Sequence, residues 1–120
     1  MGPETVFVQQ DEEPPYRLPN DQRHSVEFSW GYSGSGPAQL ARSILSDHLG
    51  TSDPHPAIYQ RFKAAFVSCF EQGKPWQITS EEIETFLAQP KIQALLEEQR
   101  ELDQLRAELA ELERRESEQP

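Results

Sequence analysis

The sequence is poor in the residues that build large cores and covalent cross-links. Only 35% of its 120 residues are hydrophobic, and Cys69 is the single cysteine, so no disulfide can form within the chain. It does not open on a basic segment followed by an apolar run, which is the pattern of a secretory signal. No apolar run approaches the roughly 20 residues that a membrane-spanning helix needs. These absences predict a small cytoplasmic protein that does not contact a membrane.

Positive charge is also scarce. The 11 Lys and Arg residues stand against 21 Asp and Glu, which gives a formal net charge of −10. Phosphate backbones are bound by clustered basic side chains, so this balance argues against general binding to nucleic acid. An acidic surface is typical of a soluble protein, or of one that docks onto a basic face of another protein.

Composition divides the chain into three parts. Residues 1–22 form an acidic, proline-rich and largely irregular tail. Residues 23–90 form a globular domain that holds most of the aromatic residues, and residues 91–120 form a coiled-coil-like helix. The predicted fold class is α+β and mostly α. It comprises one or two short strands, three packed helices and a C-terminal coiled-coil helix.

Two short segments have the pattern of strands. Residues 6–8 are apolar and form a candidate edge strand within the tail. Polar and apolar residues alternate over 25–30 and place Val26, Phe28 and Trp30 on one face, which predicts a half-buried strand.

The three packed helices are marked by their ends and by apolar stripes. They are expected over residues 37–49, 57–70 and 80–89. Pro37 suits the first position of a helix, and Gly50 suits a helix end. Cys69 falls on the apolar side of the second helix, which predicts a buried thiol. Thr79 and Glu82 form the two halves of a capping box before the third helix.

The last helix, expected over residues 91–116, has no aromatic residues and a narrow apolar seam. The seam has the spacing of a coiled coil and consists of Leu95, Leu102, Leu105, Leu109 and Leu112. Such a stripe requires a partner helix, and the simplest partner is a second copy of the chain in a homodimer. The alternative is a solvated helix that folds back on the globular domain.

A glycine-rich turn joins the predicted strand to the first helix. Several backbone N–H groups point the same way at such a junction, where an anion or phosphate can bind. The glycine spacing matches neither the dinucleotide fingerprint nor the P-loop. The candidate ligand-binding residues are Trp30, Tyr32, Ser33, Gly34, Ser35 and Gly36, with Arg23 and Arg42 as charge partners. The alternative is a structural turn that binds nothing.

No residue set names a reaction. His48 lies near Asp47 and His55 near Asp53, but these spacings match no familiar metal site, so no metal is expected. Cys69 has no basic neighbour in sequence, and no serine lies in a nucleophile elbow. The chain is therefore predicted to be non-enzymatic, with a small hydrolase at the glycine loop as the weaker alternative.

Three segments resemble an uncharacterised prokaryotic and phage family. Residues 27–41 read E-F-S-W-G-Y-S-G-S-G-P-A-Q-L-A and are similar to the family hallmark F-E-W-G-Y-G-G-S-G-P-A-Q-L-A. Residues 58–63 and 76–79 match its L-Y-x-x-F-K and W-x-L-T elements, so that the resemblance covers about residues 23–88. The family implies no reaction, and the leucine helix lies outside it. Its phage setting implies, by association, a role in counter-defence or host takeover.

Two functions are compatible with these features. The first is a non-enzymatic binding protein that holds a phosphate-bearing small ligand, such as a nucleotide signal, at the glycine loop. The second is an acidic, dimeric protein-interaction module that inhibits or bridges a host protein.

Overall fold

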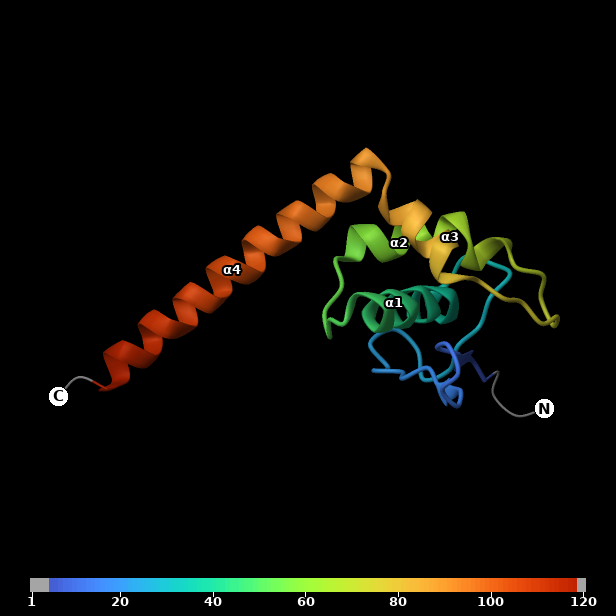
Figure 1. Ribbon diagram of the computed structural model, residues 1–120, viewed down its shortest axis with the longest axis horizontal. Helices are drawn as coiled ribbons and strands as arrows, with labels where there is room; N and C mark the ends of the chain where they lie inside the picture. Colours follow the sequence, from blue (N-terminus) through green and yellow to red (C-terminus); the bar gives the residue numbers. More distant parts are fainter. Residues whose placement is uncertain (1–4, 119–120) are drawn as a thin grey trace.

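The computed structural model describes residues 5–118, in which four α-helices follow a short hairpin (Figure 1). The elements are β1 (Phe7–Val8), β2 (Tyr16–Arg17), α1 (Ser35–Leu49), α2 (Pro56–Ala65), a 3₁₀ turn η1 (Val67–Cys69), α3 (Ser80–Leu87) and α4 (Pro90–Glu118). The mostly helical α+β architecture expected from the sequence is confirmed.

The helix ends follow the local signals except at the beginning of α1. This helix begins at Ser35 with Gly34 as its N-cap, so Pro37 is its third residue and not the first, as predicted. Gly50 ends the helix as expected, in the left-handed region at φ 68°. Thr79 Oγ1 accepts from the Glu82 N–H, and a Glu82 carboxylate oxygen accepts from the Thr79 N–H, so the predicted capping box before α3 is confirmed.

The second helix is shorter than predicted. It ends at Ala65, because Phe66 leaves helical geometry at φ −125°, and η1 follows. This break turns Cys69 to the surface, so the prediction of a buried thiol is wrong. Val67 takes the buried position instead.

The predicted strand over residues 25–30 is also wrong. Phe28 alone forms an isolated bridge, and Val26 is 70% exposed. The strands lie earlier in the chain, where β1 and β2 pair antiparallel with Phe7 opposite Arg17 and Val8 opposite Tyr16. The candidate edge strand at residues 6–8 therefore exists, and its partner comes from the segment predicted as irregular.

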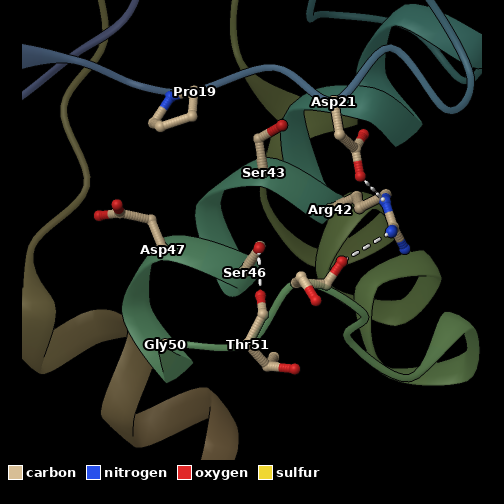
Figure 2. A pocket seen from close by; sticks show the side chains of 9 residues that line it. Pro19, Asp21, Arg42, Ser43, Ser46, Asp47, Gly50 and Thr51 are labelled. Atoms are coloured by element: carbon tan, nitrogen blue, oxygen red, sulfur yellow. Dashed lines mark hydrogen bonds and ion pairs between the residues drawn. The ribbon is translucent and has the colours of Figure 1, made fainter.

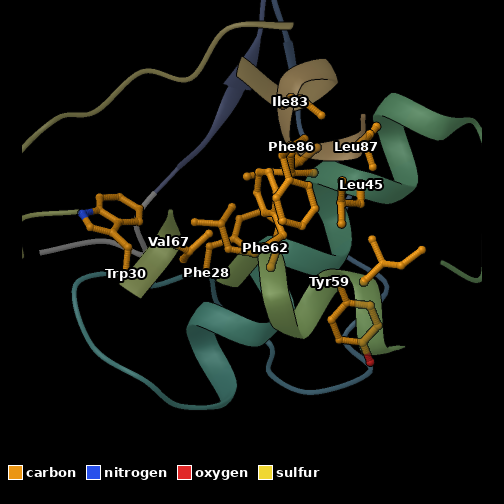
Figure 3. Packing of buried hydrophobic residues seen from close by; sticks show 14 of the residues in the cluster. Phe28, Trp30, Leu45, Tyr59, Phe62, Val67, Ile83, Phe86 and Leu87 are labelled. Atoms are coloured by element: carbon orange, nitrogen blue, oxygen red, sulfur yellow. The ribbon is translucent and has the colours of Figure 1, made fainter. Parts of the chain in front are cut away.

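The core lies between α1, α2 and α3 (Figure 3). Phe62 is completely buried, and its ring packs against those of Phe66 and Phe86 at centroid distances of 5.0 and 5.2 Å. Ile92, in the first turn of α4, is buried against this core. The beginning of α4 thus belongs to the globular body.

The rest of α4 projects away from the body (Figure 1). The molecule measures 61 × 34 × 33 Å, because a 29-residue helix is about 44 Å long. Every residue from Glu101 to Ala110 is exposed, so this part of the helix buries no side chain on the domain, and Arg106 reaches the body only through an ion pair with Asp53.

Candidate functional site

The glycine-rich turn is covered by a tyrosine from the same loop. The Tyr32 hydroxyl lies 2.8 Å from Ser29 Oγ. A methyl group added at Gly34 would come within 2.8 Å of the Tyr32 ring, and one added at Gly36 would overlap Ser29 Oγ at 1.8 Å. Gly36 is therefore required by close packing, whether or not a ligand binds.

Gly31 is required for a second reason. Its φ of +85° lies in the left-handed region, and a Cβ there would approach the Phe70 carbonyl at 2.8 Å. The Gly31 N–H donates to the Val67 carbonyl at 3.0 Å, and Gln72 Nε2 donates to the Gly31 carbonyl at 3.2 Å. These contacts tie the loop to the segment after α2.

The structure separates the predicted ligand-binding residues. Ser33, Ser35 and the partly exposed Tyr32 lie at the surface of the loop, whereas Trp30 is buried with its ring edge-on to Trp76. Arg23 is exposed, and its backbone N–H donates to Asp21. Ligand binding at this loop stays a prediction.

Arg42 was expected beside the loop on the polar side of the helix, but it lies in a different cluster. It is eight residues, about 12 Å of helix axis, from the Gly34 cap. Only 2% of it is exposed. Its guanidinium donates through Nε to Asp21 at 2.8 Å and through Nη2 to the Ser52 carbonyl at 3.1 Å. Nη1 lies 3.6 Å from an Asp53 carboxylate oxygen.

These contacts shift the pKa values of both partners. Burial favours the neutral forms of Asp21 and Arg42, but it is outweighed by the hydrogen bonds that Asp21 accepts from Gln39 and Arg42 and by the attraction between the two charges. The pKa of Asp21 is therefore lowered, with Gln39 as a further donor, and that of Arg42 is raised. Tyr59 lies beneath the guanidinium, whose carbon is 5.7 Å from the ring centroid.

Gln39 completes this cluster from the helical part of the glycine motif. Its side chain is fully buried and satisfied on both sides. Oε1 accepts from the His24 N–H at 2.7 Å, and Nε2 donates to Asp21 at 2.8 Å and to Ser43 at 3.3 Å. Gln39 and Arg42 thus hold the chain before the loop against α1. A buried glutamine with both ends bonded fixes one conformation of this segment.

A cavity of about 300 Å³ opens beside the cluster (Figure 2). Asp21, Arg42 and Asp47 line it together with hydroxyl groups, and Ser46 donates to the Thr51 carbonyl at its edge. Each guanidinium nitrogen of Arg42 lies within 3.6 Å of a protein acceptor, and the carboxylates of Asp21 and Asp53 offset its positive charge. Among residues 5–118, no group of three or more His, Cys, Asp or Glu side chains could hold a metal ion.

The leucine seam of α4 divides into two parts. Leu95 is partly buried and packs against the core. The other four leucines are exposed large hydrophobic residues, at 40%, 60%, 56% and 56%, namely Leu102, Leu105, Leu109 and Leu112. Arg106 lies 3.8 Å from Asp53, and His55 lies 3.8 Å from Glu98, which ties the middle of α4 to the turn before α2.

The polar cluster around Arg42 was not predicted. The sequence gives the helix its amphipathic pattern, but it does not show that Asp21 and Asp53 approach Arg42 from segments far along the chain. The one available signal was a glutamine and an arginine three residues apart, at positions that share one face of a helix.

The chain belongs to the family of unknown function DUF6166, whose sequence profile matches residues 2–89. The match begins well before the resemblance seen from residue 23, and it takes in β1 and β2. It ends where α4 begins, so the leucine helix lies outside the family region. Searches of curated proteins and of solved structures found no match. None of the helices within residues 5–118 is long and apolar enough to cross a membrane.

Proposed function

We propose that this member of DUF6166 is a non-enzymatic protein-interaction module that self-associates through α4. The observation that carries the proposal is the row of four leucines on a helix that leaves the body, each at least 40% exposed. Contiguous apolar surface of this kind marks an interaction site in proteins that are otherwise polar.

The spacing of the exposed leucines favours a second copy as the partner. Leu102 and Leu109 take one core position of a heptad, and Leu105 and Leu112 take the other. An identical helix presents the complementary knobs and holes. The opposite face of α4 is polar and carries ion pairs such as the one between Arg114 and Glu111 at 2.7 Å, so this face is expected to remain in contact with solvent.

The magnitude of the apolar surface limits the strength of this dimer. Burying a leucine side chain completely contributes about 1.5–3 kcal/mol, and these four are already about half covered. Eight half-burials give roughly 6–12 kcal/mol per dimer, against about 4–15 kcal/mol for association. The dissociation constant is therefore expected to be no tighter than about 1 µM.

The net negative charge supports the part of the proposal that concerns a different protein as partner. A chain with net charge −10 is suited to a basic protein partner rather than to nucleic acid. Dimerisation presents two bodies to such a partner and raises the apparent affinity. A cytoplasmic setting and a host protein as the target stay predictions from the sequence.

Cysteine cross-linking tests the self-association. In a Cys69→Ser background, Leu109→Cys is expected to form a disulfide-linked dimer under mild oxidation, because seam positions face each other. Ala107→Cys is the matched control, since it is exposed on the same turns but lies on the outward face. Equal cross-linking of the two variants, or none of either, would contradict the proposal.

A further inference from the structure

A groove of about 1000 Å³ crosses the body between β1 and the segment that leads into α3. One wall is formed by β1 and its flanking residues, 5–10, and the other by residues 75–79 and Ser80, the first residue of α3. The floor is apolar and includes Leu18, Trp30, Ile44 and Ile83. The groove lies within the body and uses no residue of α4.

The wall formed by β1 is the edge of an extended chain. Side chains of a strand alternate between its two faces, so a groove that lies over one face contacts every second residue. Residues 5–10 all line this groove, which indicates that the main-chain edge of β1, and not one of its faces, forms the wall. The Leu18 N–H donates to the Val6 carbonyl at 2.9 Å, which places this pair in the hydrogen-bonded register. The N–H and carbonyl of Phe7 then point away from β2. No described residue forms a hydrogen bond with either group.

The floor holds a buried donor that lacks a partner. Trp30 is only 9% exposed, and its Nε1 is covered yet makes no hydrogen bond within the described chain. Figure 3 shows the indole nitrogen on the side of the ring away from Val67 and Phe28. Buried indole N–H groups usually find an acceptor, so this one indicates a missing carbonyl or carboxylate.

The charge of the lining is negative. Among the described residues that line the groove, Asp47 and His48 are the ionisable ones, and neither Lys nor Arg is present. His48 Nε2 lies 2.5 Å from a Glu84 carboxylate oxygen, so it is already paired. Asp47 accepts from the Tyr16 hydroxyl at 2.8 Å and retains further acceptor sites.

We propose that this groove binds an extended segment of another protein as an added strand along β1. The bound strand pairs with the main chain of Phe7 and places a carbonyl oxygen on Trp30 Nε1. Its alternate side chains are apolar and meet the floor, and a Lys or Arg side chain reaches Asp47. Addition of a strand to an open sheet edge is a known mode of peptide recognition.

This inference does not rest on self-association through α4. The full-length Leu105→Glu variant, whose seam carries a charge, is expected to bind peptide as the wild type does. Failure of one proposal therefore leaves the other standing.

The probe is a displayed library of random dodecapeptides, selected on the full-length protein. Enriched peptides are expected to alternate apolar residues and to carry a basic residue. Phe7→Pro and its matched control Phe7→Ala both lack the phenyl ring, but only the proline variant also lacks the outward N–H. Proline is tolerated on an edge strand at a position that does not donate to its neighbour. Phe7→Pro should therefore weaken binding about fivefold to tenfold more than Phe7→Ala, which keeps the N–H.

The chain has two tryptophans, so Trp30 can be observed directly. Its indole proton resonance, assigned with a Trp76→Phe variant, is expected to move downfield when the peptide is added. No enrichment, equal affinity of Phe7→Pro and Phe7→Ala, or an unmoved Trp30 resonance would each overturn the proposal. If the Trp30 resonance shifts with protein concentration in the absence of peptide, and does not do so in Leu105→Glu, the occupant of the groove is a second copy of the chain and the proposal is wrong.

Discussion

Replacing Arg42 tests the cluster that holds the chain before the glycine loop against α1. Arg42→Met keeps the length of the side chain and removes the guanidinium. The substitution therefore abolishes the hydrogen bonds to Asp21 at 2.8 Å and to the Ser52 carbonyl at 3.1 Å, together with the pairing with Asp53 at 3.6 Å.

The expected loss follows from the burial of each partner. Breaking a fully buried ion pair costs about 3–5 kcal/mol, because the remaining charge is stranded. Here the side chains of Asp21 and Asp53 are 45% and 55% exposed and Ser52 is an exposed residue, so all three acceptors can regain water. We therefore expect a loss of about 2–3 kcal/mol in the free energy of unfolding, or roughly 8–20 °C in Tm.

Urea denaturation followed by tryptophan fluorescence measures this loss, since both tryptophans lie in the body. Arg61→Met is the matched control, because Arg61 is exposed on α2 and should change stability by less than about 0.5 kcal/mol. If Arg42→Met and Arg61→Met unfold at the same urea concentration, the cluster does not stabilise the fold and the reasoning is refuted.

Two further predictions concern the same region. The pKa of Asp21 lies below its usual value of 3.8, so its ionised form stabilises the fold above that pH and the contribution is lost as the pH falls further. Asp21→Asn should therefore be less stable than the wild type at pH 7 and show a shallower loss of stability in acid unfolding; parallel curves would contradict this. Gly36→Ala should cost about 1–3 kcal/mol in thermal unfolding, because its methyl group overlaps Ser29 Oγ, and Ser29→Gly should restore part of the loss. A neutral Gly36→Ala would show that the loop relaxes freely.

The helices could be predicted because their signals are local. Gly50 at the end of α1 and the Thr79–Glu82 capping box before α3 act within a few residues, and both occur as expected. The beginning of α4 at Pro90 follows from the same kind of signal. Each of these residues determines where a helix begins or ends through contacts within its own turn, so the prediction required no knowledge of the tertiary fold.

The failed strand over residues 25–30 has a tertiary cause. Asn20 Nδ2 donates to the Val26 carbonyl at 3.1 Å, and Gln39 Oε1 accepts from the Ser25 N–H at 3.4 Å. Side chains thus hold the main chain of this segment, where a sheet partner was expected. The alternation of polar and apolar residues was real, but it was too short to decide which neighbour would bond the backbone.

The candidate sites could be predicted only in part. The leucine seam of α4 was visible as a repeat, although the docking of Leu95 on the body was not. The groove beside β1 combines segments about 70 residues apart, and the unpaired Nε1 of Trp30 depends on that packing. Such features arise from long-range contacts that no local pattern encodes.

Sedimentation velocity of the full-length chain tests the central proposal of self-association most directly. Over about 10–500 µM, a range set by the expected affinity, the weight-average mass should rise from 13.8 kDa toward twice that value. The Leu105→Glu variant should remain at 13.8 kDa throughout, while keeping the unfolding midpoint of the body. A wild-type mass that stays at 13.8 kDa over the whole range would contradict the proposal.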